Sequence, residues 1–384
     1  MGFEDLGLTA YTLRALSNLK INEPTEVQKA VIPPIIAGTD VAVRSPTGSG
    51  KTLAFVLGLI TRISQSYRDR YALIFSPTRE LAIQTRDVIN RLQLGGMTAR
   101  AIYGDMSNAD ILALGDMSIK FTVATPRKLW DLTQKKRFYP ERYNLVVLDE
   151  ADELLLNGFK SDIDYVLARI SILQTLFFSA TLDKSFRNLS ASYQKDPMIF
   201  EIGEKEVVRT ISTEIINVAN DTAKLLILLK ILREEPGQVI VFVFSRVRAT
   251  RLGEKLAQLG INATFTHKEV LQVRREEIMN DFRSGKLKVL VGTDILARGI
   301  DIPRLPLVVE YDQPFGSDSS IHRAGRTGRM GNIGRVISFN DLTGRDPASL
   351  RRLSDGSSRR KKRFSGSSAT NTHVGMPSHV LKNR

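Results

Sequence analysis

The sequence contains no cysteine. Disulfide bonds, thiolate zinc sites and a cysteine nucleophile are therefore excluded, and the redox compartment stays undecided. The sequence also has no apolar stretch near the roughly 18 residues that indicate a membrane-spanning helix. Its first residues, MGFED, lack the basic and then apolar segments of a secretory signal peptide. Because a targeting leader could have been trimmed, the cytoplasm, the nucleus and an organelle are all compatible with the sequence.

Acidic residues are in the minority. Lysine and arginine together number 55, against 41 aspartate and glutamate residues, which gives a formal net charge of +14. Such an excess favours a polyanionic partner, because neutralising phosphate groups releases the counterions that surround a nucleic acid. The chain of 384 residues is longer than a single hydrophobic core usually serves, so we expect two domains.

Short and nearly continuous apolar runs alternate with longer amphipathic stretches. The runs are residues 40–44, 72–76, 121–125, 145–148 and 176–179 in the first half, and 239–245, 263–267, 289–293, 307–311 and 335–339 in the second. Continuous runs of this length are typical of parallel strands that are buried on both faces of a sheet. The stretches between them, such as residues 81–92 and 249–259, carry apolar residues at helical spacing. The alternation predicts an α/β fold with two parallel sheets.

The composition changes at two places. The segment GEKEVVRTIST, at residues 203–213, is charged and has no clear period, and from about residue 341 the chain becomes basic and serine-rich. Segments of this kind contain too few apolar residues to join a hydrophobic core. We therefore expect a first domain over residues 1–203, a linker over 204–213, a second domain over 214–343 and a disordered basic tail over 344–384.

Polar motifs follow the apolar runs directly, at the strand ends where open parallel sheets bind their ligands. The most specific is RSPTGSGKT, which stands between a predicted strand and a predicted helix as a Walker A loop does, with Ser45 in place of the usual first glycine. Gly48 and Gly50 would let backbone N–H groups face a phosphate. Lys51 would reach the β- and γ-phosphates, and Thr52 would ligate Mg²⁺.

Three carboxylates follow the fourth apolar run, in the segment LVVLDEAD. Asp149 ends a predicted strand as a Walker B aspartate does, which would place its carboxylate near Thr52 and the magnesium ion. Glu150 would polarise the attacking water, and Asp152 could also cap the helix that follows. Mg²⁺ and Lys51 are the cations that would offset the mutual repulsion of these carboxylates.

The tetrad DEAD, at residues 149–152, is the signature of the DEAD-box ATP-dependent RNA helicases of superfamily 2, and the sequence resembles this family over roughly residues 3–340. The resemblance implies two RecA-like parallel-sheet domains and the cofactors ATP and Mg²⁺. KINEPTEVQ resembles the family's Q motif, in which Gln28 would read adenine through N6 and N7, while Phe3 would stack on the base. The residues of the first domain implied to bind ATP are Phe3, Thr25, Gln28, Thr47, Gly48, Ser49, Gly50, Lys51 and Thr52.

Further motifs of the family follow along the chain. SPTRELA resembles motif Ia, SAT motif III, VFVFSR motif IV, GTDILARGIDIP motif V and HRAGRTGR motif VI. The residues thereby implied to bind RNA are Pro77, Thr78, Arg79, Thr125, Pro126, Ser245, Arg246, His267, Gln272, Arg275, Thr293, Asp294 and Arg298. Those implied to couple nucleotide state to domain closure are Asp152, Ser179, Thr181 and His322. Small polar residues and backbone amides favour contacts with phosphate and 2′-OH groups over sequence reading.

The resemblance also assigns catalytic residues to the second domain. Arg326 and Arg329 would be arginine fingers that meet the γ-phosphate, while Gly299 and Asp301 would complete the nucleotide site. The catalytic set that the resemblance implies is Lys51, Asp149, Glu150, Arg326 and Arg329. Because two domains would supply this set, hydrolysis would depend on their closure around one ATP.

Four positions depart from the family pattern. Lys20 stands where the Q motif usually has glycine, Asp105 replaces the second of two paired glycines, Arg127 replaces the glycine of TPGR, and Lys268 replaces the glycine after His267. The last three lie on the RNA side, whereas the catalytic residues Lys51, Asp149, Glu150, Arg326 and Arg329 are intact. We therefore expect ATP hydrolysis to be retained, while the RNA path, the RNA affinity or the dependence on partners could differ.

The leading hypothesis is an RNA-dependent ATPase that separates short duplexes or remodels RNA–protein complexes. An ATP-locked RNA clamp with suppressed turnover is the first alternative, and a DNA-translocating helicase is the second. We expect RNA to be bound largely without sequence preference, by a monomer that does not contact a membrane and that protein regulators could control. The basic tail could tether RNA by charge, act as a nuclear signal or be a solvated end.

Overall fold

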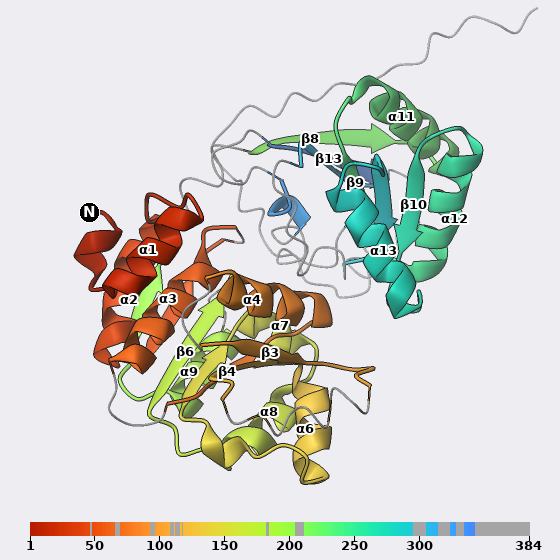
Figure 1. Ribbon diagram of the computed structural model, residues 1–384. Coiled ribbons are helices and arrows are strands. Elements are labelled where there is room, and N and C mark those ends of the chain that lie inside the picture. Colours follow the sequence, from red (N-terminus) through yellow and green to blue (C-terminus); the bar gives the residue numbers. More distant parts are fainter. Residues whose placement is uncertain are drawn as a thin grey trace, which may run out of the picture. The chain divides into compact units, whose positions relative to one another are not determined.

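The computed structural model describes residues 1–46, 48–65, 70–92, 97–107, 111, 116, 118–181, 184–203, 211–294, 305–313, 323–327 and 334–341. The chain divides near residue 207 into two compact units, and each unit contains its own parallel sheet (Figure 1). The α/β class and the two parallel sheets predicted from the sequence are thereby confirmed. Within the described residues, no helix combines the length and the apolar character needed to cross a membrane.

The first unit has a seven-stranded sheet with the order β3-β4-β2-β5-β6-β1-β7. Its strands are β1 (Val41–Arg44), β2 (Ala72–Phe75), β3 (Ala99–Ile102), β4 (Phe121–Ala124), β5 (Leu145–Leu148), β6 (Gln174–Ser179) and β7 (Met198–Glu201). Every neighbouring pair is parallel. The segments that follow β1, β2, β4, β5 and β6 therefore start from the same edge of the sheet, where the polar motifs were expected to gather.

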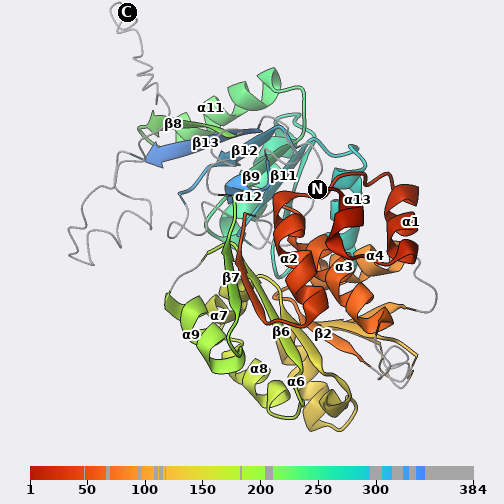
Figure 2. The same ribbon diagram turned by 90° about the vertical axis from the view of Figure 1, so that its left-hand side faces the viewer.

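Helices cover both faces of this sheet, as Figure 2 shows. They are η1 (Phe3–Leu6), α1 (Ala10–Asn18), α2 (Glu26–Ala37), α3 (Lys51–Ser64), α4 (Arg79–Arg91), α6 (Pro126–Gln134), η3 (Pro140–Arg142), α7 (Ala151–Leu156), α8 (Lys160–Leu167) and α9 (Lys184–Tyr193). One hydrophobic cluster joins α2, α3 and α4 to one face, and a second joins α6, α8 and α9 to the other. Alternate residues of β5 divide between the clusters, Leu145 in the first and Val146 in the second, so the strand is buried on both faces.

The second unit has a six-stranded parallel sheet with the order β10-β11-β9-β12-β13-β8. Its elements are β8 (Ile211–Val218), α11 (Asp221–Glu234), β9 (Val239–Phe242), α12 (Arg246–Gln258), β10 (Ala263–Thr266), α13 (Gln272–Arg283), β11 (Val289–Gly292), β12 (Leu307–Glu310) and β13 (Gly334–Asp341). One cluster joins Leu228 of α11 and Leu252 of α12 to Val241 of β9 and Val309 of β12. Helices α11 and α12 thus cover the same face of this sheet.

Three strands escaped the sequence prediction, and all three lie at the edge of a sheet. The first sheet ends in β3 and β7, and the second ends in β8. The expected linker over residues 204–213 is also too long, because β8 begins at Ile211. An edge strand needs no continuous apolar run, and residues 211–217 are accordingly partly buried or exposed, with only Val218 of this strand buried.

Candidate functional site

The glycine-rich loop leads from β1 into α3. Gly48 and Gly50 have φ angles of 84° and 92°, in the left-handed region that favours glycine. The ammonium group of Lys51 donates to the carbonyl oxygens of Ser45 at 2.5 Å and Pro46 at 3.2 Å. Lys51 is 8% exposed. The loop therefore surrounds a buried cation with acceptors that phosphate oxygens could replace.

Gln28 ties the start of α2 to this loop. Its Oε1 accepts from the backbone N–H of Thr25 at 3.0 Å, and the Thr25 hydroxyl caps the helix by accepting from the Gln28 N–H. The Nε2 of Gln28 donates to the carbonyl oxygen of Gly50 at 3.2 Å, and a Cβ on Gly50 would lie 2.6 Å from that nitrogen. One lone pair and one N–H of the carboxamide remain for a base edge.

Asp149 follows β5 and is 2% exposed. Its Oδ1 accepts from the Glu150 N–H at 3.1 Å, whereas its Oδ2 is buried with no hydrogen-bond partner among the described residues. Burial raises the pKa of Asp149 to about 7; the charges of Glu150 and Asp152 act in the same direction, and Lys51 opposes them. The site is thus short of positive charge, as the sequence analysis anticipated.

Glu150 has a left-handed backbone, with φ 49° and ψ 54°, at the N-terminus of α7. This conformation is uncommon for a residue with a side chain, although Lys20, Asp105, Lys136 and Asp196 also adopt it in this chain. Its Oε2 is also buried without a hydrogen-bond partner in the part of the chain that the structure describes. In the same residues, no three acidic or histidine side chains are grouped closely enough to hold a metal ion alone. A cation here would need further ligands from phosphate and water, which is how Mg²⁺ usually binds.

The predicted coupling residues of the first unit contact one another. The Thr181 hydroxyl donates to Oδ2 of Asp152 at 3.2 Å, and the Thr181 N–H donates to the Ser179 hydroxyl oxygen at 3.0 Å. The carbonyl oxygen of Ser179 accepts from the N–H of Ser45 at 3.0 Å. A short series of contacts therefore leads from the acidic motif through β6 to the glycine-rich loop.

Other predicted residues lie elsewhere. Phe3 is 2% exposed and belongs to the hydrophobic cluster with Leu6 and Val31; its stacking on a base stays a prediction. Thr52 is partly buried at the start of α3. The predicted residues Thr47, Arg298, Gly299, Asp301, His322 and Arg329 lie outside the described residues.

The RNA-side motifs of the first unit stand at helix N-termini. The Thr78 hydroxyl caps α4 by accepting from the Leu81 N–H, and the Arg79 guanidinium lies 4.2 Å from the centre of the Tyr103 ring. Pro77 is buried beside them, between β2 and α4. Backbone N–H groups at a helix N-terminus suit phosphate.

The motif TPRK opens α6. Thr125 precedes this helix without a side-chain cap, and Pro126 is its first residue. Arg127, which replaces a glycine of the family, pairs with the buried Asp162 at 3.1 Å and lies 4.3 Å from the centre of the Trp130 ring. The substituted side chain is therefore held against the protein by two partners.

Two other departures have a common backbone explanation. Lys20 has a φ angle of 58° and Asp105 one of 61°, both in the left-handed region. Glycine adopts this region freely, aspartate tolerates it better than most residues, and lysine does so only with strain. Glycine would adopt the backbone conformation at these two positions without strain, whereas this chain holds it with other side chains.

In the second unit, predicted RNA contacts follow β9, β10 and β11. Ser245 caps α12 by accepting from the Arg248 N–H, and Arg246 pairs with Glu269. The Nε2 of His267 lies 3.1 Å from the Thr250 hydroxyl. Burial, followed by the charges of Arg246 and Arg275, lowers the pKa of His267.

Further predicted residues lie on the same elements. Arg275 is partly buried on α13, Thr293 follows β11, and Gln272 begins α13 with a side chain outside the described set. These positions stay predictions for RNA contact.

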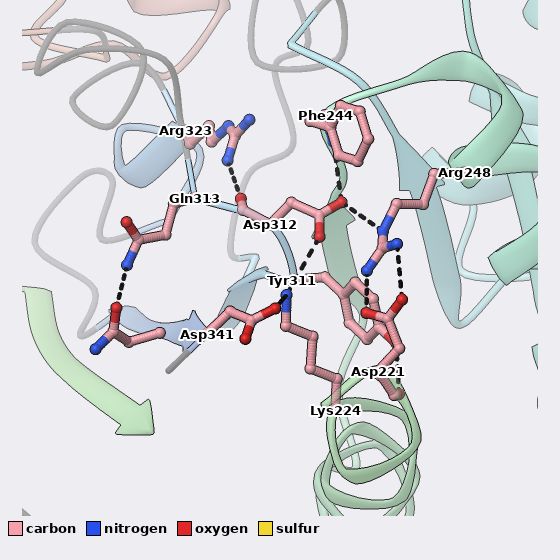
Figure 3. Close-up of polar contacts among 10 residues, drawn as sticks. Asp221, Lys224, Phe244, Arg248, Tyr311, Asp312, Gln313, Arg323 and Asp341 are labelled. Carbon is pink, nitrogen blue, oxygen red and sulfur yellow. Dashed lines mark hydrogen bonds and ion pairs between the residues drawn. The ribbon is translucent and has the colours of Figure 1, made fainter. Parts of the chain in front are cut away.

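Asp312, which the sequence alone did not indicate, follows β12 and is 2% exposed (Figure 3). Its carboxylate accepts from the Phe244 N–H at 3.2 Å and lies 2.8 Å from Nε of Arg248. Its carbonyl oxygen accepts from Nη1 of the fully buried Arg323 at 2.8 Å, and Nε of Arg323 donates to Asp294 at 2.5 Å. Asp312 therefore joins motifs IV, V and VI. The available signal was its position directly after an apolar run.

A buried lysine completes this network. Lys224 of α11 is 1% exposed, and its ammonium lies 3.5 Å from Asp312 and 3.7 Å from Asp341. Arg326, predicted to be an arginine finger, is 3% exposed, and its N–H donates to the carbonyl oxygen of Arg323. The backbone of motif VI is thus anchored to the sheet through Arg323.

Comparisons with known proteins connect both units to one family. Residues 25–189 match the family described as DEAD/DEAH box helicase, and residues 223–331 match the helicase conserved C-terminal domain. Together the two matches cover more than half of the chain. The second match includes the missed residues Lys224 and Asp312.

The individual relatives are helicases. The chain is 34% identical over 340 residues to the ATP-dependent RNA helicase DbpA of Bacillus subtilis, covering 88% of this chain and 71% of that protein. It is 31% identical over 356 residues to the ATP-dependent RNA helicase eIF4A of Lodderomyces elongisporus, covering 91% and 89%. The solved structure of S. cerevisiae Dbp5 bound to RNA and ADP BeF3 superposes with a TM-score of 0.81 at 29% identity, over 92% of each chain. This likeness confirms the predicted two-domain fold.

Proposed function

The chain belongs to the DEAD-box family of ATP-dependent RNA helicases, and from this premise we propose that it hydrolyses ATP when RNA is bound and thereby separates short duplexes or remodels RNA–protein complexes. The names of its relatives favour this activity over the ATP-locked clamp considered above. Sequence-independent RNA binding, a monomeric state and control by protein regulators are parts of the same proposal.

ATP would bind at the glycine-rich loop. Its phosphates would take over Lys51 from the carbonyl oxygens of Ser45 and Pro46, which now accept from the ammonium at 2.5 and 3.2 Å. The free N–H and lone pair of the Gln28 carboxamide would read the adenine edge, and that side chain is already fixed against Gly50. The base and the phosphates would thus be held by two segments that contact each other before ATP arrives.

Mg²⁺ fits beside these phosphates, because Oδ2 of Asp149 is a buried oxygen without a described partner and Thr52 lies in the first turn of α3. When bound, the ion supplies positive charge that stabilises the phosphoryl oxygens in the transition state. Asp149 and Thr52 would hold the ion. Glu150 would orient the attacking water and accept its proton, and its strained backbone fixes that carboxylate at the end of β5.

Coupling to RNA would use contacts that already exist within each unit. In the first, Thr181 connects Asp152 to Ser179. In the second, Arg323 connects Asp294 of motif V to motif VI, which carries the proposed arginine fingers Arg326 and Arg329. We propose that RNA bound at the N-termini of the flanking helices favours the closed arrangement that completes the catalytic set.

One observation carries the proposal: two buried carboxylate oxygens without described hydrogen-bond partners, on Asp149 and Glu150, stand after β5 in a sheet whose glycine-rich loop holds a buried lysine. The test is steady-state ATP hydrolysis with and without single-stranded RNA. RNA should stimulate turnover, and Glu150→Gln should lower the stimulated rate by about 10²-fold or more. The exposed Glu141→Gln serves as the matched control and should leave the rate unchanged. Equal rates with and without RNA would contradict the proposal.

A further inference from the structure

A cavity of about 550 Å³ lies in the second unit between α11 and α12. Its volume is within the range of known ligand sites. Its wall is formed by one side of each helix and by residues that follow β9 and β12. Apart from Ser245 at one end, none of its lining residues has a role in the proposed ATP or RNA chemistry.

The inner wall of this cavity is apolar. Leu225 of α11 and Leu252 of α12 line it, together with Tyr311, which follows β12. Val247, in the first turn of α12, also lines it and is 53% exposed. Covering this exposed valine and the concave apolar wall with an apolar group would remove apolar surface from water and so stabilise a complex.

The outer wall is cationic. Arg248, Arg251 and Lys255 recur at helical spacing on α12, and all three line the cavity. The single acid of the lining, Asp221, is already taken, because it accepts two hydrogen bonds from Arg248, at 2.5 and 3.1 Å (Figure 3). Arg251 and Lys255 are exposed and make no ion pair with any described residue. The cavity therefore carries two uncompensated positive charges next to an apolar wall.

We propose that this cavity binds an acidic segment of a partner protein, with one bulky apolar side chain against Leu225, Val247 and Leu252 and flanking carboxylates on Arg251 and Lys255. The charge of the cavity disfavours the chain's own tail, whose segment RRKKRFSG is basic, and a second copy of a chain with a net charge of +14. It suits RNA less well, because Tyr311 is 4% exposed and offers no open ring on which a base could stack.

The wall of the cavity shares a residue with the contact network of motif VI. Arg248 forms part of its wall and also lies 2.8 Å from Asp312, whose carbonyl oxygen accepts from Arg323 of motif VI. A segment bound here would therefore be connected to motif VI through Arg248 and Asp312. Docking itself does not depend on ATP or RNA and can be measured without either.

The experiment selects short random peptides displayed on phage against the immobilised full-length chain. A second selection uses the double variant Arg251→Glu with Lys255→Glu. Peptides enriched on the unmodified chain should contain acidic residues around a large apolar one. A fluorescein-labelled copy of the most enriched peptide, measured by anisotropy, should bind the double variant about tenfold more weakly or worse.

A matched control places the same charge reversal elsewhere in this unit. Arg283→Glu with Lys286→Glu changes two exposed cations at the end of α13 and should leave the peptide affinity unchanged. Enriched peptides without acidic character, or equal binding to both double variants, would overturn the proposal. An RNA affinity that falls more in the cavity variant than in the control would assign the cavity to RNA instead. Each of these results is independent of whether the chain unwinds RNA.

Discussion

Replacing Asp149 with asparagine should stabilise the nucleotide-free protein above pH 7. The carboxyl group is 2% exposed, and its pKa rises to about 7 from the ordinary value of 3.8 because burial and two neighbouring carboxylates disfavour its charge. The unfolded chain ionises near 3.8, so the folded state binds the additional proton between these values. Folding therefore loses stability as the pH rises from about 4 to about 7, and the loss is complete above that range.

The interval between the two pKa values sets the magnitude. It corresponds to roughly 4 kcal/mol of unfolding free energy at pH 8 and roughly 2 kcal/mol at pH 5. Asparagine keeps the shape of the side chain and removes the charge, so its advantage should approach these values from below. The same change removes a carboxylate proposed to hold Mg²⁺, so ATP with Mg²⁺ should stabilise the variant far less than the unmodified chain.

Urea unfolding followed by tryptophan fluorescence can measure this effect, because the chain has one tryptophan and Trp130 lies in the first unit. The measurement compares both proteins at pH 5 and pH 8 without nucleotide. Asp196→Asn is the control, since Asp196 is exposed and asparagine also tolerates its left-handed backbone. A gain of equal size at both pH values, or a loss at pH 8, would refute the reasoning.

Three further predictions concern other residues. Lys20→Gly should relieve the left-handed backbone and raise the unfolding free energy by about 1 kcal/mol in the same urea assay, whereas Lys29→Gly within α2 should lower it by a similar amount. Lys224→Met should destabilise the second unit by about 3 kcal/mol, measured by hydrogen exchange in α11 and β12, because Asp341 and Asp312 would lose the buried cation that they share, while Arg248 would still pair with Asp312; unchanged exchange would contradict this. The pKa of His267, followed by NMR, should lie below its ordinary value and should rise in Arg246→Gln. Because the folded state binds this proton less readily than the unfolded chain, stability should fall as the pH drops below about 6.5.

The strands that could be predicted from the sequence are mostly those buried on both faces of a sheet. Strand β5 reads as a continuous apolar run because Leu145 and Val146 face different hydrophobic clusters, and the helices on both sides need both faces apolar. Strands β3, β7 and β8 have a neighbour on one side only. Most residues of β7 and β8 are exposed or partly buried, so the composition of these strands resembles that of a loop. Strand β3 is mostly buried, but the charged Arg100 interrupts its apolar run.

The candidate site divides in the same way between local and distant contacts. Lys51 and Asp149 could be predicted because one short segment determines each position: a turn that needs glycine, or the end of a buried strand. Asp312 contacts Arg248, Arg323 and Lys224, which come from three different segments of the chain. No spacing along the sequence therefore links these residues. The network exists only because β9 and β12 are adjacent in the sheet.

The left-handed residues indicate which property is retained at positions that depart from the family. Lys20 and Asp105 adopt a left-handed conformation that glycine adopts freely, although each carries a side chain that makes the conformation less favourable. Glu150 is left-handed as well, but glycine could not replace it if its carboxylate accepts the proton of the attacking water. Removing the strain at Lys20 should therefore leave the activity unchanged, whereas removing the Glu150 side chain should not, if its carboxylate acts as proposed. The same conformation thus has two different causes, and measuring ATP hydrolysis in Lys20→Gly and Glu150→Gly separates them: only the second substitution should abolish turnover.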